Sequence, residues 1–201
     1  MQAERSVSTP AIIAGSAILA AAIAAFGFAI EGGWNAEGAA AAARLTARFS
    51  FFWFVTAWSA SALVKLWPGG WRSVLLRRRR AVGLGFAAAH FVHLAALLTA
   101  VLVFATPRSL TTIYGGGAGY VFVALMAITS NDWSVRALGP RNWKLLHTVG
   151  GVVIAAIFFV SYFGRLEDKP WLAIPTLSLL GGAVLLKLAA WMKSAMRPRE
   201  A

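Results

Sequence analysis

Long apolar stretches alternate with short charged ones along the whole sequence. An apolar run of about 20 residues, rising about 1.5 Å per residue, is long enough to cross a hydrocarbon core of about 30 Å as a helix. We expect six such spans, at approximately residues 10–30, 48–67, 81–105, 117–131, 144–164 and 170–192. The pattern therefore predicts an all-α polytopic membrane protein, in which a six-helix bundle forms a single transmembrane domain over residues 1–201.

The first span has a competing interpretation. Residues 6–30 carry no charge, and Pro10 suits a first helical turn. A basic start, an apolar core and small residues are also typical of a cleaved signal peptide, although such cores are usually about 7–15 residues long. The longer core found here favours a retained helix.

Helix-breaking residues set the expected ends of the other spans. Alanines before residue 48 could extend the second helix outward, and Pro107 stops the third. Glycines at positions 115–117 and 119 weaken the fourth, so we expect its regular helix to run from near Ala118 to near Ser130. Residues 131–144 are expected to form a basic loop.

Composition agrees with a membrane protein and excludes other classes. Hydrophobic residues make up 59% of the chain and charged residues only 13%. The net charge of +12 does not indicate nucleic-acid binding, because the cations lie between apolar spans instead of forming a stripe on a polar domain. The sequence has no cysteine, which excludes disulfides, thiolate sites and iron–sulfur clusters. Any redox chemistry therefore needs a bound cofactor.

Lysine and arginine predict the orientation in the membrane. The terminal segments and the second and fourth loops hold twelve of these residues, whereas the first, third and fifth loops hold five. By the positive-inside rule, both termini are expected to be cytoplasmic. Tryptophans fall near the span ends, as interface anchors do, at positions 34, 67, 71, 133, 143, 171 and 191.

All three histidines of the sequence lie in or at predicted spans. His90 and His93 lie in a charge-free stretch behind four arginines, Arg77 to Arg80, and His147 opens another apolar stretch. An ionisable side chain in a membrane span indicates a functional site, and neutral imidazole is a common ligand of metals and of haem iron. The alternative is that the histidines only hydrogen-bond to neighbouring helices.

The spacing of the histidines bears on what they bind. His90 and His93 are three residues apart and so share a helix face, where they could bind one metal or face different neighbours. A b-type haem with one axial nitrogen on each side calls for ligands from two helices. Zinc is less suited, because the spans offer no carboxylate as second-shell partner or general base.

Depth gives a further constraint on pairing. Counted at about 1.5 Å per residue from Arg80, His90 lies about 15 Å deep and His93 about 20 Å, whereas His147 lies about 5 Å beyond Lys144. The offset favours His90 over His93 as the partner of His147. The alternatives are one protein ligand for each haem, or a single haem.

Two further features could contact a porphyrin. Gly150 and Gly151 follow His147 by one turn, and such small residues leave a hollow for a porphyrin face or allow two helices to approach closely. The arginine run is explained by topology and by anionic lipid. Arg79 could in addition pair with haem propionates, as Arg136 or Arg141 equally could.

Two motifs resemble the ferric reductase-like transmembrane domain family, whose core is shared by NADPH oxidases and ferric reductases. The first is Arg79-Arg80-Ala81-Val82-Gly83-Leu84 followed by His93, and the second is Thr129-Ser130, Leu138-Gly139, Trp143, Leu146 and His147. The resemblance covers roughly residues 45–190. It implies a six-helix bundle in the bacterial inner membrane, with b-type haem moving electrons from quinol or a cytoplasmic-side donor towards the outer face.

The match to the family pattern is incomplete. His93 matches the ligand on the third helix and His147 the first ligand on the fifth. The second histidine of the fifth helix would fall at Val160, which cannot ligate iron, and His90 is an additional histidine. The resemblance thus implies haem b, one in preference to two, with ligands among His90, His93 and His147.

We expect an electron-transfer subunit of an oxidoreductase with no dehydrogenase domain of its own, because Gly-x-Gly-x-x-Gly and phosphate-loop motifs are absent. Electrons would come from quinol, which makes quinone a second cofactor candidate, or from a partner such as a soluble reductase or a larger membrane complex, with lipids around the helices. The alternative is a haem-poor or haem-free structural or assembly subunit, which the missing ligand at Val160 favours. A small transporter is disfavoured, since the spans lack a paired acid or base.

Overall fold

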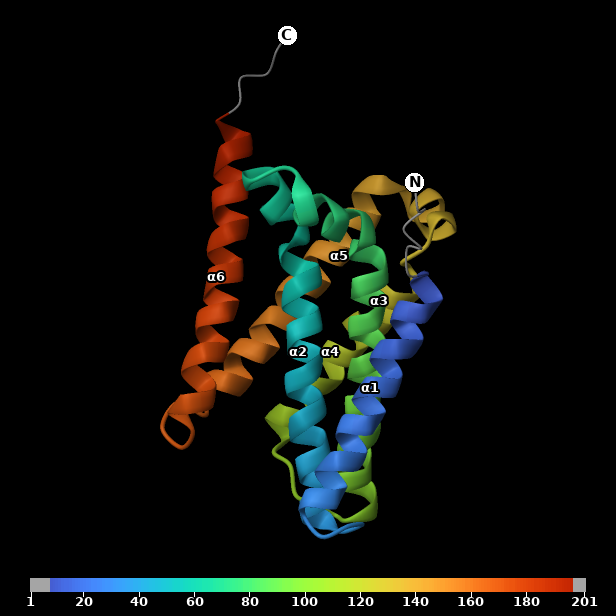
Figure 1. Cartoon of the computed structure of the whole chain (residues 1–201), viewed down its shortest axis with the longest axis vertical. Coiled ribbons are helices and arrows are strands. Elements are labelled where there is room, and N and C mark those ends of the chain that lie inside the picture. Colours follow the sequence, from blue (N-terminus) through green and yellow to red (C-terminus); the bar gives the residue numbers. More distant parts are fainter. Residues whose placement is uncertain (1–7, 197–201) are drawn as a thin grey trace. The chain divides into compact units, whose positions relative to one another are not determined.

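The computed structural model describes residues 8–196, and the regular structure within that range is helical (Figure 1). The elements in order are α1 (Thr9–Ile30), α2 (Ala36–Leu66), α3 (Gly70–Leu98), a π-helical turn η1 (Thr99–Val103), α4 (Leu110–Ile128), α5 (Asp132–Phe163) and α6 (Pro170–Ala195). The all-α prediction is confirmed.

Length and composition identify the membrane-crossing candidates. Within residues 8–196, five helices are long and apolar enough to cross a membrane, and α4 contributes a shorter apolar segment, Thr112–Ile128. The chain is therefore a multi-pass membrane protein. The count of six spans and the sides of the termini stay predictions, and Arg5, Arg197 and Arg199, which contributed to the charge pattern, lie outside the described residues.

The described chain divides into two compact units. The first contains α1, α2 as far as Phe54, and the stretch from Arg80 to Thr112. The second contains Val55–Arg79 and the stretch from Ile113 onward. The single transmembrane domain over residues 1–201 stays a prediction.

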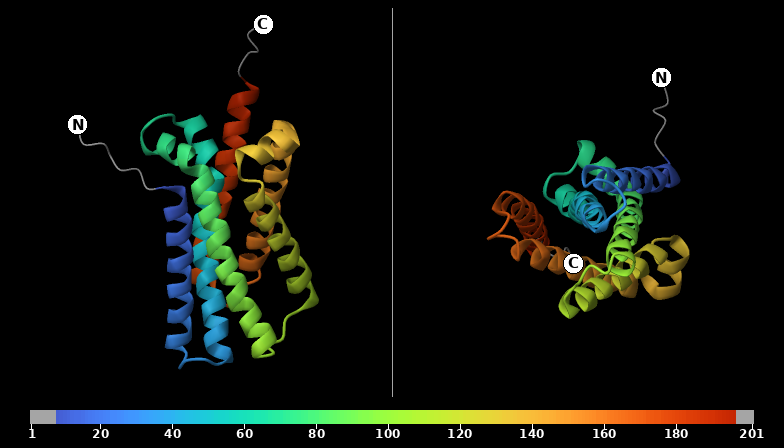
Figure 2. Two further views of the ribbon diagram at one scale, coloured as in Figure 1. Left: turned by 90° about the vertical axis from the view of Figure 1, so that its right-hand side faces the viewer. Right: turned by 90° about the horizontal axis from the view of Figure 1, so that it is seen from below.

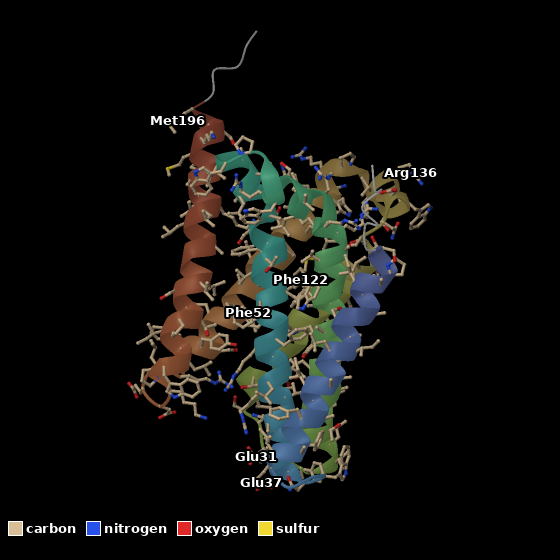
Figure 3. The ribbon with its side chains drawn as sticks, viewed as in Figure 1. Glu31, Glu37, Phe52, Phe122, Arg136 and Met196 are labelled. Carbon is tan, nitrogen blue, oxygen red and sulfur yellow. The ribbon has the colours of Figure 1, made fainter. Side chains whose placement is uncertain are left out.

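Capping residues define the start of α1 and of α2 in the first unit. The Ser8 hydroxyl accepts from the Ala11 N–H at 3.3 Å, and Pro10 lies in the first turn as expected. Asn35 Oδ1 accepts from the Gly38 N–H at 2.7 Å and so caps α2. Glu31, in the connection between the two helices, pairs with Arg44 at 3.3 Å. Glu31 and Glu37 lie at the same end of this unit (Figure 3).

Small residues bring α1 and α2 into close contact. Figures 1 and 2 both show α1 beside the first part of α2. A Cβ on Gly27 would lie 2.5 Å from the backbone nitrogen of Ala42, so only glycine permits this approach. Ala42, Ala43 and Ala96 form a buried cluster that joins α2 to α3 in this unit. The first unit is thus packed by small side chains.

The third helix differs from the predicted span at both ends. It begins at Gly70, so the four arginines lie within the helix and not before it. Arginine is a good helix former, and its long stem lets the charge reach the interface from within a helix. At its other end, the α-helix stops at Leu98 and a π-helical turn follows, before Ala105 adopts a φ of 49° ahead of Pro107.

The fourth helix starts earlier than expected. It begins at Leu110 and includes all the glycines that were predicted to delay it. Glycine weakens a helix in water, but in lipid the backbone groups have no other partner, which favours the helix. Gly119 also serves packing in the second unit, because a Cβ there would lie 2.7 Å from Ile157 of α5.

The basic stretch 131–144 is helical, so the predicted loop is wrong. Asn131 caps α5 by accepting from the Ser134 N–H at 2.8 Å. The helix breaks only at Gly139, with φ 75° and ψ 150°, directly before Pro140. The stretch that was predicted as a loop is therefore a helix with an N-terminal cap at Asn131 and one break at Gly139. After α5, Pro170 opens α6, which packs against α5.

Candidate functional site

Two of the predicted site histidines lie side by side in the first unit. His90 and His93 project from neighbouring positions on α3, with ring centroids 5.2 Å apart and planes inclined by 47°. The Phe86 ring lies 5.1 Å from His90 on the same helix. Both imidazoles are partly buried. The shared face predicted from their spacing is present.

Each of these histidines contacts a buried hydroxyl of α2. Ser50 Oγ lies 2.9 Å from His90 Nδ1, and Thr46 Oγ1 lies 3.3 Å from His93 Nδ1. Both hydroxyl residues are 0% exposed. Hydrogen bonding to a neighbouring helix, which the sequence left open as an alternative role, is thus present. The two contacts with hydroxyl groups use Nδ1, and the His93 ring also hydrogen-bonds to the Ala43 backbone.

The third histidine has a different environment, in the second unit. His147 Nε2 lies 3.1 Å from Thr129 Oγ1, and the Trp143 ring stacks on the imidazole with centroids 4.1 Å apart. Trp143 Nε1 donates to the Thr129 carbonyl at 2.8 Å. Three residues of the second motif therefore meet at one place: the turn after α4 supplies the threonine, and α5 supplies the two rings.

Side chains already fill the space beside the two glycines of α5. A Cβ on Gly150 would lie 2.8 Å from the Met126 sulfur, and one on Gly151 would lie 2.8 Å from Trp58 Nε1. This is the arrangement that close helix packing requires. The contact of these glycines with a porphyrin stays a prediction.

Arg79 lies near His147 and near Lys187 in the second unit. Arg79 interacts electrostatically with both His147 and Lys187. Lys187 Nζ lies 4.6 Å from the centroid of the Trp58 ring, a cation–π geometry. The sequence analysis assigned Lys187 no role, although a lysine within a predicted span is itself a signal of function.

Val160, which takes the place of a histidine of the family pattern, has no group that could bind iron. Val160 exposes 67% of its surface on α5, and its apolar side chain has no donor atom for iron. Its neighbour Tyr162 is buried in the second unit. The departure from the family pattern at this position therefore remains.

The donor set fits haem better than a protein-ligated metal. In the part of the chain that the structure describes, no three His, Cys, Asp or Glu side chains are close enough to hold a metal ion together. A structural zinc site needs about four protein ligands, whereas haem iron takes only axial ligands from the protein. Neutral imidazoles held by hydroxyl groups meet that smaller requirement.

Fold and side chains together define a class, a multi-pass helical membrane protein with hydrogen-bonded histidines in its apolar helices. The chain is similar to the protein-methionine-sulfoxide reductase haem-binding subunit MsrQ of Brucella ovis, Brucella canis and Brucella melitensis, with 33% identity over 141 residues in each case. The match covers 62% of this chain and 60% of each relative. The chain thus spans about 60% of the length of the curated relatives it matches.

Within the family that the two motifs resemble, we expect the chain to be most similar to the haem-binding membrane subunit of the bacterial methionine sulfoxide reductase system. These relatives confirm that expectation. No family model matches the chain, so membership of the ferric reductase-like family stays a prediction. No solved structure matches it either.

Proposed function

We propose that this chain is a haem-binding membrane subunit that transfers electrons for a partner. One observation carries the proposal: two adjacent imidazoles on α3, each hydrogen-bonded through Nδ1 to a fully buried hydroxyl. A hydrogen bond on the second ring nitrogen is the usual support of a ligating histidine. The haem-binding subunits to which the chain is similar add to this support.

The residues have separate tasks in this proposal. Haem iron would be held by His90 or His93 in the first unit, and by His147 in the second. Arg79 would hold a propionate by charge-assisted hydrogen bonds. When bound, haem iron supplies a centre that takes up and releases one electron. We propose b-type haem, one in preference to two because Val160 replaces a ligand of the family pattern.

The electron donor and acceptor in this proposal are those that the family resemblance implies. Electrons would enter from quinol or from a cytoplasmic-side donor and leave to a partner at the outer face of a bacterial inner membrane. That partner would be a soluble reductase or a larger membrane complex.

Spectroscopy of the purified protein tests haem binding. After expression with full haem supply, a pyridine haemochrome assay should find haem, and the dithionite-reduced minus oxidised spectrum should show b-type bands. Single alanine variants at His90, His93 and His147 should identify the ligands by loss of these bands. Phe91→Leu, which changes an exposed residue between two of the histidines, is the matched control and should keep them.

The opposite result supports the second candidate function. A featureless spectrum at full haem supply, in protein that remains folded, would remove the electron-transfer proposal. A haem-free structural or assembly subunit would then account for Val160 and for the filled space beside Gly150 and Gly151.

A further inference from the structure

The hydroxyl groups that contact the α3 histidines have already used their hydrogens. Ser50 Oγ donates to the Ala47 carbonyl at 3.0 Å, and Thr46 Oγ1 donates to the Ala42 carbonyl at 2.7 Å. A hydroxyl has one hydrogen and two acceptor lone pairs. Towards the histidines, both oxygens therefore act as acceptors.

An accepting hydroxyl decides which ring nitrogen carries the proton. For Ser50 and Thr46 to accept, Nδ1 of His90 and Nδ1 of His93 must each be an N–H donor. A neutral imidazole with its proton on Nδ1 has its lone pair on Nε2. Both α3 histidines are thereby in the tautomer that coordinates a metal through Nε2.

The same reasoning gives the opposite tautomer for His147. Thr129 Oγ1 donates to the Leu125 carbonyl at 2.6 Å, so it accepts from His147 Nε2 at 3.1 Å. The proton of His147 is therefore on Nε2 and its lone pair on Nδ1. Coordination through Nε2 would require His147 to give up the bond to Thr129.

We propose that Ser50 and Thr46 are positioning residues, which hold His90 and His93 as Nδ1–H tautomers and so prepare Nε2 of each for iron. Their complete burial supports this role, because water is not at hand to replace either hydroxyl. A hydrogen bond on Nδ1 also increases the electron donation of a ligating imidazole. The consequence for iron rests on the proposed function, whereas the tautomers themselves do not.

Nitrogen-15 NMR of the haem-free protein in detergent tests the tautomers directly. With labelled histidine, and with assignment by the single histidine variants, His90 and His93 should show protonated Nδ1, and His147 protonated Nε2. Ser50→Ala should change the ring shifts of His90 alone, and Thr46→Val those of His93 alone. Ser50→Thr and Thr46→Ser keep a hydroxyl and should restore the wild-type shifts.

Thr176→Val is the matched control, because it removes a buried hydroxyl of α6 that donates only to its own helix, at Leu172. It should leave all three histidine tautomers unchanged. Protonated Nε2 in wild-type His90 and His93 would overturn the proposal, whether or not the protein binds haem.

The haem-loaded protein tests the consequence for iron. Loss of the hydrogen bond weakens electron donation to ferric iron, so the midpoint potential should rise in Ser50→Ala, in Thr46→Val or in both, according to which histidine is a ligand. The conservative variants should return the potential to the wild-type value. An unchanged potential in both variants, with haem bound, would overturn the positioning role, and failure to bind haem would count only against the proposed function.

Discussion

At the residue scale, Gly151 is a packing position whose replacement has a definite cost. Gly151→Ala would place a Cβ 2.8 Å from Trp58 Nε1, so the indole must move. Overpacking of this kind costs about 1–3 kcal/mol, and we expect a lower unfolding temperature in detergent.

Gly181→Ala is the control for this variant. No atom lies within 4 Å of a Cβ at Gly181, which is in the helical interior of α6. Alanine should stabilise the helix there by about 0.5–1 kcal/mol. Equal melting temperatures for the two variants would show that Trp58 does not pack on Gly151.

The histidines of the candidate site could be predicted from the sequence, but the hydroxyl residues that contact them could not. Histidine within an apolar span is a strong signal, and His90, His93 and His147 were found from it. Thr46 and Ser50 were missed because a hydroxyl in an apolar helix usually bonds to its own backbone, as both do here. Their second role depends on the register of α2 against α3 in the first unit, which periodicity does not reveal.

At the element scale, the approach of α1 to α2 depends on one glycine. Gly27→Leu should separate the helices, because the neighbouring atoms belong to the Ala42 backbone and cannot rotate away. We expect destabilisation at or above the usual overpacking cost of about 1–3 kcal/mol. Gly15→Leu on the same helix has open space and should be tolerated.

Crosslinking can separate helix displacement from a general loss of stability. The sequence has no cysteine, so a cysteine pair introduced into α1 and α2 reports on these two helices alone. Crosslinking that is unchanged in Gly27→Leu and in Gly15→Leu would contradict the close approach.

The break in α5 makes a second prediction at this scale. Gly139 has a φ of 75° and a ψ of 150°, a region that is nearly restricted to glycine. Gly139→Ala should therefore lose about 1–3 kcal/mol of stability, measured by thermal unfolding. Gly116→Ala, in the helical part of α4 with open space, should gain stability instead.

Element types were easier to predict than element ends. The length of the apolar runs predicted the helices, but it did not show that charged residues continue them. The arginines in α3 and the stretch 131–144 in α5 are helical, because helix propensity and capping act on charged residues as well as on apolar ones. A gap in hydrophobicity marks the end of a span and not the end of a helix.

At the scale of the whole molecule, the charge distribution makes a prediction about orientation. The positive-inside rule places the basic first part of α5, which contains Arg136, in the cytoplasm and the loop that contains Asp168 outside. Arg136→Cys should then react with a membrane-impermeant maleimide only after permeabilisation, and Asp168→Cys should react in intact cells. The cysteine-free wild type is the control, and the reverse pattern would invert the topology.

Synthesis runs from the N-terminus, so α2 enters the bilayer before α3. The hydroxyl hydrogens of Thr46 and Ser50 are already bonded within α2, and that helix can be inserted with these donors satisfied. The histidines follow 40 residues after Ser50 and 47 after Thr46, and acceptors for their ring N–H groups are then in place. The helix α2, which is synthesised first, thus lowers the free energy needed to transfer the rings of His90 and His93 into lipid.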